Sequence, residues 1–552
     1  MNDGVKTNGS DCSRFSFLNK RVFRFLFLLA GGILTALTLI FTELWLLQWI
    51  TVIPVGLVVL RLAENTSLRL RTWYCYGLVF FWGYYAVVLH WFVSMYPLSF
   101  TGLSKGAAAF VVLAGVFGLS LLQALISGLA FIVYGVASRN RFLSEYRFLR
   151  PFLFAGCWTV FEWLQTFGWW GVPWGRLTLG QIDSIVTVQT AEWFGSYFVS
   201  FLLLSVNLCL AYAILYATLR KAAVITACAI FLSNLLLGSV LFFTDKDSGK
   251  TVTVAAVQGN ISNKWEPGTL ESSLEIYRRY TLLSAESGAD IVVWPETAIP
   301  YDLTTSPSVL KDLKVIAKEA DVILLAGAFR SEKNVYGEML EYNSLFAILP
   351  DGTVNETVYD KQHLVPFGEF VPLRGLVTTL FPPLADVGML DDDLSNGETG
   401  KNIVTECGTI GGMICFDSIY ESVALDAVRN GAELFCLSSN DAWFLDSAAI
   451  YMHHNQARLR AIEVGRYVVR SGNSGITSVI APTGEILEDI EPLTEGYVVS
   501  DVSLRTDRTL YSAIGNLFVW LLSIGLAVPC TTSIYFCVRE KIKTRERKRS
   551  DV

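Results

Sequence analysis

Hydrophobic residues in the first 243 positions form long runs separated by short polar segments. The runs cover roughly residues 25–42, 44–60, 73–93, 107–136, 152–167, 186–218 and 223–243, and one more covers 514–537. A helix of about 20 apolar residues is long enough to cross the hydrocarbon core of a bilayer. The pattern therefore predicts a membrane α-helical bundle of about eight spans, seven of them before residue 244.

The pattern changes between residues 244 and 512. Short apolar runs, such as VTVAAVQGN (252–260) and VILLAGAF (322–329), alternate with amphipathic segments such as 268–287 and 307–320. Further strands are predicted at DIVVWPE, NSLFAILP, GTIGGMIC, ELFCLSSN, YVVRSGNSG and ITSVIAPTG, and further helices near 418–430 and 447–465. Apolar strands alternating with helices indicate an α/β layer domain whose sheets are covered on both faces.

These patterns divide the chain into four parts. We expect a membrane domain at 1–243, an α/β domain at 244–512, a C-terminal span at 513–538 and a basic tail at 539–552. Hydrophobic residues make up 52% of the chain and charged residues only 17%, which is far too apolar for a wholly water-exposed protein of this size. A basic tail next to an apolar span marks a cytoplasmic flank more simply than it marks a nucleic-acid partner.

Basic residues in the short loops predict the orientation of the spans. They gather before the first span and in every second loop after it, at Lys20, Arg21, Arg24, Arg69, Arg71, Arg139, Arg141, Arg147, Arg150, Arg220 and Lys221. The alternate loops, near 94–105 and 168–185, carry only Lys105 and Arg176. Because basic loops stay in the cytoplasm, both termini are expected there and the α/β domain on the opposite side.

The cysteines and histidines give no signal for a metal site. The ten cysteines show no CxxC pair, and most lie in apolar runs rather than in a disulfide framework. The four histidines are scattered apart from His453 and His454, which would point in different directions on a helix. We expect neither a metal nor a cofactor.

Cys415 ends the stretch GTIGGMIC, and the rest of the α/β domain is interpreted around it. Gly408, Gly411 and Gly412 relieve crowding before an apolar run, which suits a buried strand that presents its last residue at a sharp turn into a helix. A thiol there would face a cleft at the edge of a sheet. The alternative is an ordinary core cysteine, which is what most free cysteines are.

Two further charged residues follow predicted strands or lie in adjoining loops. Glu296 follows the strand that ends in VVWPETA, and Lys361 lies in YDKQHLVPFGE. Alone, the first suits a helix cap and the second a solvated surface. Together with Cys415 they supply the parts of covalent acyl transfer, because a carboxylate can deprotonate a thiol and an ammonium can stabilise the oxyanion.

These motifs resemble those of the nitrilase superfamily, in which a Glu, a Lys and a Cys form the catalytic triad in the same chain order. Within that superfamily the chain resembles the apolipoprotein N-acyltransferase family. The resemblance rests on WPETA, VQGNISNKW (257–265), KQHLVPFGEFVP (361–372), GGMIC, SNDAWF (439–444) and the PWG of 173–175. It implies that the soluble part is a nitrilase-like α-β-β-α sandwich outside the membrane.

The resemblance also implies a ping-pong acyl transfer in the outer leaflet of a bacterial inner membrane. Cys415 would take an acyl chain from the sn-1 ester of a phospholipid, typically phosphatidylethanolamine, as a thioester. The N-terminal amine of a diacylglyceryl-cysteine apolipoprotein would then accept the chain. Glu296 would act as general base, Lys361 would stabilise the oxyanion, and Glu369 would orient the lysine or the substrate amine. The enzyme is expected to be a monomer with a periplasmic catalytic domain.

Several positions carry weaker expectations. The family usually has Cys-Tyr-Glu at the nucleophile, whereas this chain has Phe416 and Asp417 after the cysteine, which puts the roles of these two positions in doubt. Trp265 and Trp443 are candidates for lining the acyl or headgroup site, with core packing as the alternative. Trp174 and its neighbours form either an interfacial aromatic belt or an opening for a lipid headgroup. Residues 370–390 are expected to form a mobile flap that dips into the membrane interface and gates lipid entry, with an ordinary loop folded onto the domain as the alternative.

Two other functions remain open on the sequence. A membrane-anchored amidase of the nitrilase type would use the same triad with water as acceptor, but a single anchor would serve it. A non-catalytic receptor or scaffold on an inactive nitrilase fold would not need all three reactive residues.

Overall fold

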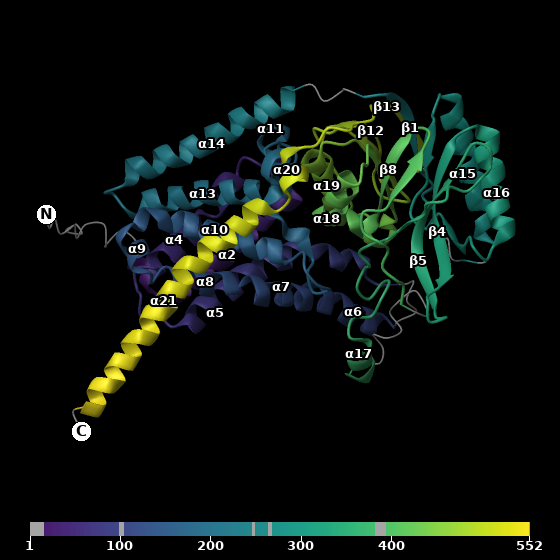
Figure 1. Cartoon of the computed structure of the whole chain (residues 1–552). Helices are drawn as coiled ribbons and strands as arrows, with labels where there is room; N and C mark the ends of the chain where they lie inside the picture. Colours follow the sequence, from purple (N-terminus) through teal and green to yellow (C-terminus); the bar gives the residue numbers. More distant parts are fainter. Residues whose placement is uncertain are drawn as a thin grey trace. The chain divides into compact units, whose positions relative to one another are not determined.

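The computed structural model describes residues 16–98, 104–244, 249–262, 266, 268–380 and 393–550. These residues fall into two compact units. The first, here called the helical unit, lies within Met1–His90, Leu113–Leu241 and Asn516–Val552. The second, here called the sheet unit, lies within Trp91–Val112 and Phe242–Gly515 and contains both β-sheets (Figure 1).

The apolar runs of the first 243 residues form helices, as the pattern predicts. The main ones are α2 (Arg21–Ile40), α3 (Gln48–Thr51), α4 (Ile53–Leu62), α5 (Leu70–Val88), α6 (Lys105–Leu113), α7 (Ser120–Ser127), α8 (Leu129–Ala137), α10 (Arg150–Leu164), α13 (Ser196–Leu215) and α14 (Arg220–Phe243), followed much later by α21 (Leu517–Ser550). The predicted run 186–218 is not one helix. It begins as two four-residue helices, α11 (Ile185–Val188) and α12 (Ala191–Phe194), before Gly195 turns the chain into α13 with a φ of 78°.

Five helices of the described residues are long and apolar enough to cross a membrane. They are Arg21–Ile40, Lys105–Ala137, Ser196–Leu215, Arg220–Phe243 and Leu517–Arg547. The segment Gln48–Leu62 is apolar but shorter, and α10 has only 15 residues. The structure thus supports several apolar helices, while the number of eight spans stays a prediction.

Polar side chains are buried inside the helical unit and bind backbone groups of residues 173–181. Glu162 accepts a hydrogen bond from the backbone N–H of Leu177 at 2.6 Å, and Gln48 donates to the carbonyl of the same residue at 2.8 Å. Trp174 is 3% exposed in this region, and the hydroxyl of Tyr84 binds the carbonyl of Gly175 at 2.6 Å. The segment 173–181 is therefore folded into the helical unit. As expected for a costly charge in an apolar helix, Glu162 faces this polar interior.

The sheet unit contains two mixed sheets. The seven-stranded sheet has the order β13-β1-β2-β4-β5-β6, with β3 paired to β4, and the six-stranded sheet has the order β12-β11-β10-β9-β8-β7. The first consists of β1 (Thr251–Gln258), β2 (Ile291–Val293), β3 (Ile299–Asp302), β4 (Ile323–Lys333), β5 (Met339–Ile348), β6 (Tyr359–Asp360) and β13 (Gly496–Ser503). The second consists of β7 (Asn402–Thr405), β8 (Gly408–Ile414), β9 (Leu434–Ser439), β10 (Val468–Gly472), β11 (Thr477–Ile480) and β12 (Ile486–Ile490).

Alternating side chains of the central strands build two separate cores. In β1, Val252 and Val254 join a cluster shared with β8, β9 and β10, so they lie between the two sheets. Ala255 and Val257 of the same strand point the other way and pack with helices α15 (Thr269–Glu286) and α16 (Pro307–Ala320). Helices α18 (Glu421–Arg429) and α19 (Ala448–Val464) contact the six-stranded sheet (Figure 1). The described residues thus form the expected α-β-β-α sandwich.

Candidate active site

The reactive residues come together because parallel strands end at the same edge of each sheet. Strands β1, β2 and β4 run parallel in one sheet, and β8, β9 and β10 run parallel in the other. Glu296 follows β2, and Cys415 follows β8 directly. Ser438 at the end of β9 donates a hydrogen bond to the carbonyl of Trp294 at 2.8 Å, which joins the two sheets at this edge.

The nucleophile turn has the shape predicted from GTIGGMIC. Cys415 follows β8 with a φ of 48°, a strained value for a residue with a side chain, and opens a short 3₁₀ helix, η10 (Cys415–Ile419). The close packing beneath it requires glycine. A Cβ on Gly412 would lie 2.4 Å from the ring of Tyr359, and one on Gly411 would lie 2.7 Å from the ring of Phe435. The fold therefore presents the thiol at a sharp strand-to-helix turn, where it is half-buried.

Three hydrogen-bond donors surround the carboxylate of Glu296. One oxygen accepts from Nζ of Lys361 at 2.8 Å and from Nδ2 of Asn343 at 2.7 Å. The other accepts from the backbone N–H of Asn440 at 2.9 Å. Because all three partners donate, the ionised carboxylate fits this site, and its position is fixed before substrate binds.

Lys361 lies between two carboxylates and is 1% exposed. Its Nζ is 2.8 Å from Glu296 and 2.9 Å from Glu369, and Asn343 Nδ2 also reaches Glu369 at 2.9 Å. Burial by itself would lower the pKa of Lys361, but the two carboxylates more than offset this and hold it well above its usual value. Burial raises the pKa of Glu369, although Lys361 partly counteracts that effect. The ammonium is thus permanently charged at neutral pH.

The thiol of Cys415 interacts electrostatically with both triad partners. Burial raises the pKa of the thiol well above its usual value, the charge of Glu296 raises it further, and Lys361 acts in the opposite direction. The resting form is therefore the neutral thiol rather than a standing thiolate. Such a group needs a base at the moment of attack, and the fixed carboxylate of Glu296 is a base of that kind.

Asp417 links the nucleophile turn to the segment that follows Lys361. Its buried carboxylate accepts hydrogen bonds from the backbone N–H groups of Ile414 at 3.0 Å, Gln362 at 3.1 Å and His363 at 2.8 Å, and from the hydroxyl of Tyr359 at 2.8 Å. Burial raises the pKa of Asp417 to about 6. These contacts suit a positioning role for the shorter acidic side chain, because they hold the backbone on both sides of the site.

Phe416 packs in an aromatic group beside this turn. Its ring meets that of Tyr420 edge-on at 5.5 Å, and Tyr420 stacks on His363 at 3.9 Å. A phenylalanine at this position therefore keeps an apolar contact within the sheet unit.

The remaining sequence candidates are less well connected to the triad. Trp443 is half-buried in η11 (Asp441–Phe444), directly after the loop that supplies the Asn440 N–H. Trp174 belongs to the helical unit, and Trp265 lies outside the described residues. Of the predicted flap, Arg374–Leu380 forms the short helix α17, and positions 381–390 lie outside the described residues. The lining roles of these tryptophans and the motion of the flap stay predictions.

Sequence reasoning missed Asn343, which bridges the two carboxylates, and the backbone N–H of Asn440. Asn343 opens the predicted strand NSLFAILP, and its polar side chain in an otherwise apolar strand was the available signal. Asn440 lies inside SNDAWF, but it contacts Glu296 through its backbone N–H. Every residue except proline has this group, so the sequence gives no signal for it.

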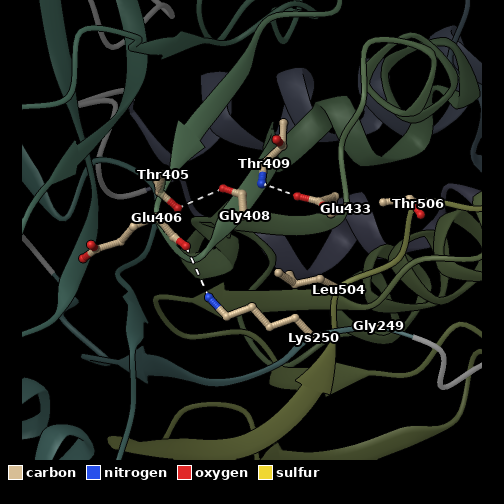
Figure 2. A pocket seen from close by; sticks show the side chains of 9 residues that line it. All are labelled: Gly249, Lys250, Thr405, Glu406, Gly408, Thr409, Glu433, Leu504 and Thr506. Atoms are coloured by element: carbon tan, nitrogen blue, oxygen red, sulfur yellow. Dashed lines mark hydrogen bonds between the residues drawn. The ribbon is translucent and has the colours of Figure 1, made fainter.

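A pocket of about 330 Å³ lies at the opposite ends of the strands (Figure 2). It is lined by Gly249, Lys250, Thr405, Glu406, Gly408, Thr409, Glu433, Leu504 and Thr506. Lys250 donates to the carbonyl of Glu406 at 3.3 Å, and Glu433 accepts from the backbone N–H of Thr409 at 2.8 Å. These residues lie at or before the starts of β1, β8 and β9 and at or after the ends of β7 and β13, whereas Cys415 and Glu296 follow the ends of β8 and β2, so this pocket is separate from the triad.

Comparisons with known proteins agree with the two-part organisation. Residues 253–510 match the family model of the carbon-nitrogen hydrolases, and residues 31–209 match that of the apolipoprotein N-acyltransferase N-terminal domain. The apolipoprotein N-acyltransferase of Geobacter metallireducens is 30% identical over 513 residues, which cover 91% of this chain and 94% of that protein. The chain belongs to the apolipoprotein N-acyltransferase family. Membership makes it an acyltransferase of lipoprotein biosynthesis.

The comparisons also find a second curated relative and a solved structure. The apolipoprotein N-acyltransferase of Gloeobacter violaceus is 31% identical over 487 residues, covering 87% of this chain and 88% of that protein. A solved carbon-nitrogen hydrolase from Helicobacter pylori is 18% identical, with a TM-score of 0.36, and covers 49% of this chain and 95% of its own.

Burial of His363 makes the stability of the folded protein depend on pH. Burial lowers the pKa of its imidazole from 6.5 to about 4, so the unfolded chain binds this proton more readily than the folded one. Above pH 6.5 the ring is neutral in both states and the free energy of unfolding is at its full value. As the pH falls toward 4, the free energy of unfolding decreases by up to about 3 kcal/mol, because the unfolded chain takes up the proton first. We expect the unfolding midpoint of the wild type to fall more steeply between pH 7 and 4 than that of His363→Phe. Parallel curves, with His90→Gln as the control, would contradict this.

Proposed function

We propose that this chain transfers an acyl chain from the sn-1 position of a phospholipid to the N-terminal amine of the diacylglyceryl-cysteine of an apolipoprotein. The acyl chain is carried as a thioester on Cys415. The observation that supports this most strongly is the arrangement of Glu296 and Lys361, a carboxylate held by three donors and an ammonium held beside it.

In the first half-reaction Glu296 takes the proton of the Cys415 thiol while Sγ attacks the ester carbonyl. Negative charge develops on the carbonyl oxygen, and the ammonium of Lys361 stabilises it. The C–O bond of the ester then breaks, and the proton on Glu296 passes to the departing alkoxide. The products are the acyl-thioester and a lysophospholipid. Glu369 and Asn343 keep the lysine and the base in register, because Glu369 accepts from Lys361 while Asn343 donates to both Glu296 and Glu369.

In the second half-reaction the α-amine of the acceptor attacks the thioester carbonyl. Lys361 again faces the oxyanion, and Glu296 accepts a proton from the attacking amine. The C–S bond breaks as the amide forms, and Glu296 returns its proton to the departing sulfur. The thiol is thereby restored, so the same base serves both halves of the cycle.

The proposal extends to the membrane setting. The donor is phosphatidylethanolamine, the protein acts as a monomer in the bacterial inner membrane, and 244–512 form a periplasmic domain with both chain ends in the cytoplasm. Support comes from the five apolar helices among the described residues and from the basic residues of alternate loops.

A transfer assay in lipid vesicles tests the proposal. Phosphatidylethanolamine labelled in either the sn-1 or the sn-2 chain is incubated with the full chain and a diacylglyceryl lipopeptide. We expect the sn-1 label on the peptide amine, no transfer to an N-acetylated control peptide, and no transfer by Cys415→Ser. Release of labelled free fatty acid as the main product, whether or not the peptide is present, would instead support hydrolysis by a nitrilase-type enzyme and overturn the proposal.

A further inference from the structure

A buried asparagine at the triad edge of the sheet unit joins two loops, and the reaction above does not use it. Asn473 directly follows β10 and is 1% exposed. One of its neighbours is the loop after β1, and the other is the loop after β9, which begins at Asn440. The second loop also supplies the N–H that binds the carboxylate of Glu296. Asn473 is therefore one residue away from the base.

The side-chain amide of Asn473 pairs with the loop after β1 as a neighbouring strand would. Its Oδ1 accepts from the backbone N–H of Ile261 at 3.1 Å, and its Nδ2 donates to the carbonyl of Ile261 at 2.9 Å. The backbone carbonyl of Asn473 also accepts from the N–H of Asn260 at 2.7 Å. These three hydrogen bonds fix the position of Asn473 against the end of the other sheet.

Two further hydrogen bonds run from Asn473 to the peptide group between Ser439 and Asn440 and to the side chain beside it. The backbone N–H of Asn473 donates to the carbonyl of Ser439 at 3.0 Å. Its Nδ2 donates to Oδ1 of Asn440 at 3.2 Å. The N–H of the same peptide group donates to Oε2 of Glu296 at 2.9 Å. Because a peptide group is planar, holding its oxygen and the adjoining side chain also sets the direction of its N–H.

The direction of this N–H matters for the base. The carboxylate of Glu296 is held at one oxygen by Lys361 and Asn343 and at the other by the Asn440 N–H. A peptide that turned away would weaken one of the bonds that stop the carboxylate from rotating. We propose that Asn473 is a positioning residue of the acyl transfer: it aligns the Ser439–Asn440 peptide so that Glu296 keeps the orientation in which it takes the thiol proton. This rests on the proposed role of Glu296 as the base.

The rate at which p-nitrophenyl butyrate acylates Cys415 tests the proposal. In this step the thiol proton passes to Glu296, the S–C bond forms and the ester C–O bond breaks, so released p-nitrophenolate reports the acylation rate constant. The full-length protein in detergent is used, and the mass of the Cys415 peptide confirms the adduct. We expect Asn473→Ala to lower the acylation rate constant by about tenfold, as for one misplaced hydrogen bond. The ester concentration that gives half the maximal rate should stay unchanged.

The same substitution in a Glu296→Gln background separates positioning from structure. If Asn473 acts through the base, its removal from an enzyme without that base should lower the rate by less than about twofold. Equal losses in both backgrounds, with unfolding midpoints near those of the parent proteins, would make Asn473 a structural residue and overturn the proposal.

A second variant decides the case in which Asn473→Ala fails to fold. Asn440→Ala removes the side chain that Asn473 contacts but keeps the N–H that binds Glu296. Its acylation rate constant should fall by about three- to tenfold, and again by less than about twofold in the Glu296→Gln background. An unchanged rate in Asn440→Ala would overturn the proposal.

An asparagine elsewhere in the sheet unit supplies the matched control. Asn402 in β7 also binds a backbone group through its side chain, the carbonyl of Ala427 at 2.9 Å, so Asn402→Ala should keep the wild-type rate within a factor of two. The probe contains no lipid headgroup and no amine acceptor. Acylation that behaves as predicted in an enzyme without lipid transfer would therefore support this inference while contradicting the proposed function.

Discussion

Replacing Glu296 with glutamine will reduce kcat/KM for acyl transfer by on the order of 10³-fold, within the range of general acid–base catalysis. The change removes the base, and it also disrupts the site. The carboxylate accepts from Lys361, Asn343 and the Asn440 N–H, so the glutamine NH₂ must face a donor in either orientation. Initial rates of transfer to a diacylglyceryl lipopeptide measure the effect.

A surface glutamate of the same sheet provides the control for this substitution. Glu332 on β4 pairs with Arg330 at 2.5 Å and is about half exposed, so Glu332→Gln should leave the transfer rate within a factor of two of the wild type, as expected for a surface pair. A Glu296→Gln enzyme that retained more than a tenth of the wild-type rate would show that another group deprotonates the thiol.

Replacing Lys361 with methionine will lower activity by about 10²- to 10³-fold and destabilise the fold by about 3–5 kcal/mol. The first effect follows from losing the charge that faces the oxyanion. The second follows because Glu296 and Glu369 would be left as two buried carboxylates without their common cation. Transfer rates and thermal unfolding midpoints in detergent are the two measurements.

A double variant separates these two effects. In Lys361→Met/Glu369→Gln one of the buried negative charges is also removed, so the unfolding midpoint should recover much of its loss while the transfer rate stays low. Arg278→Met, which breaks the exposed pair with Glu319, should leave the unfolding midpoint close to that of the wild type. Recovery of activity together with stability would contradict the assignment of Lys361 to the oxyanion.

Strands and helices with continuous apolar cores could be predicted from the sequence. Residues 307–320 form α16 with the predicted bounds, and β1, β4, β8 and β9 begin within one residue of the predicted runs. The strands β3, β6, β7, β12 and β13 were not predicted. Physically, these are short or edge strands: β6 has two residues, and β12 has an exposed acidic sequence, ILEDI. Such strands are held by pairing rather than by burial, so they leave little hydrophobic pattern.

The nucleophile turn could also be predicted, because its residues carry local constraints. Glycines before an apolar strand end indicate close packing, and Gly411 and Gly412 do lie against aromatic rings. The partners of the triad could not be found this way. Asn343 and His453 reach the site through strand pairing and helix packing, and their contacts depend on residues more than 35 positions away. The single predicted helix at 186–218 was wrong because Gly195 breaks it with a positive φ.

The central claim, that Cys415 carries the acyl chain between the two substrates, is tested most directly by trapping that intermediate. The full-length protein is incubated with a phospholipid of defined sn-1 chain and no acceptor, and the Cys415 peptide is analysed by mass spectrometry. We expect a mass increase equal to that acyl group on Cys415, removable by hydroxylamine and chased onto a diacylglyceryl lipopeptide when it is added. Transfer of the acyl chain to the lipopeptide without any such adduct, or by Cys415→Ala at the wild-type rate, would contradict the account.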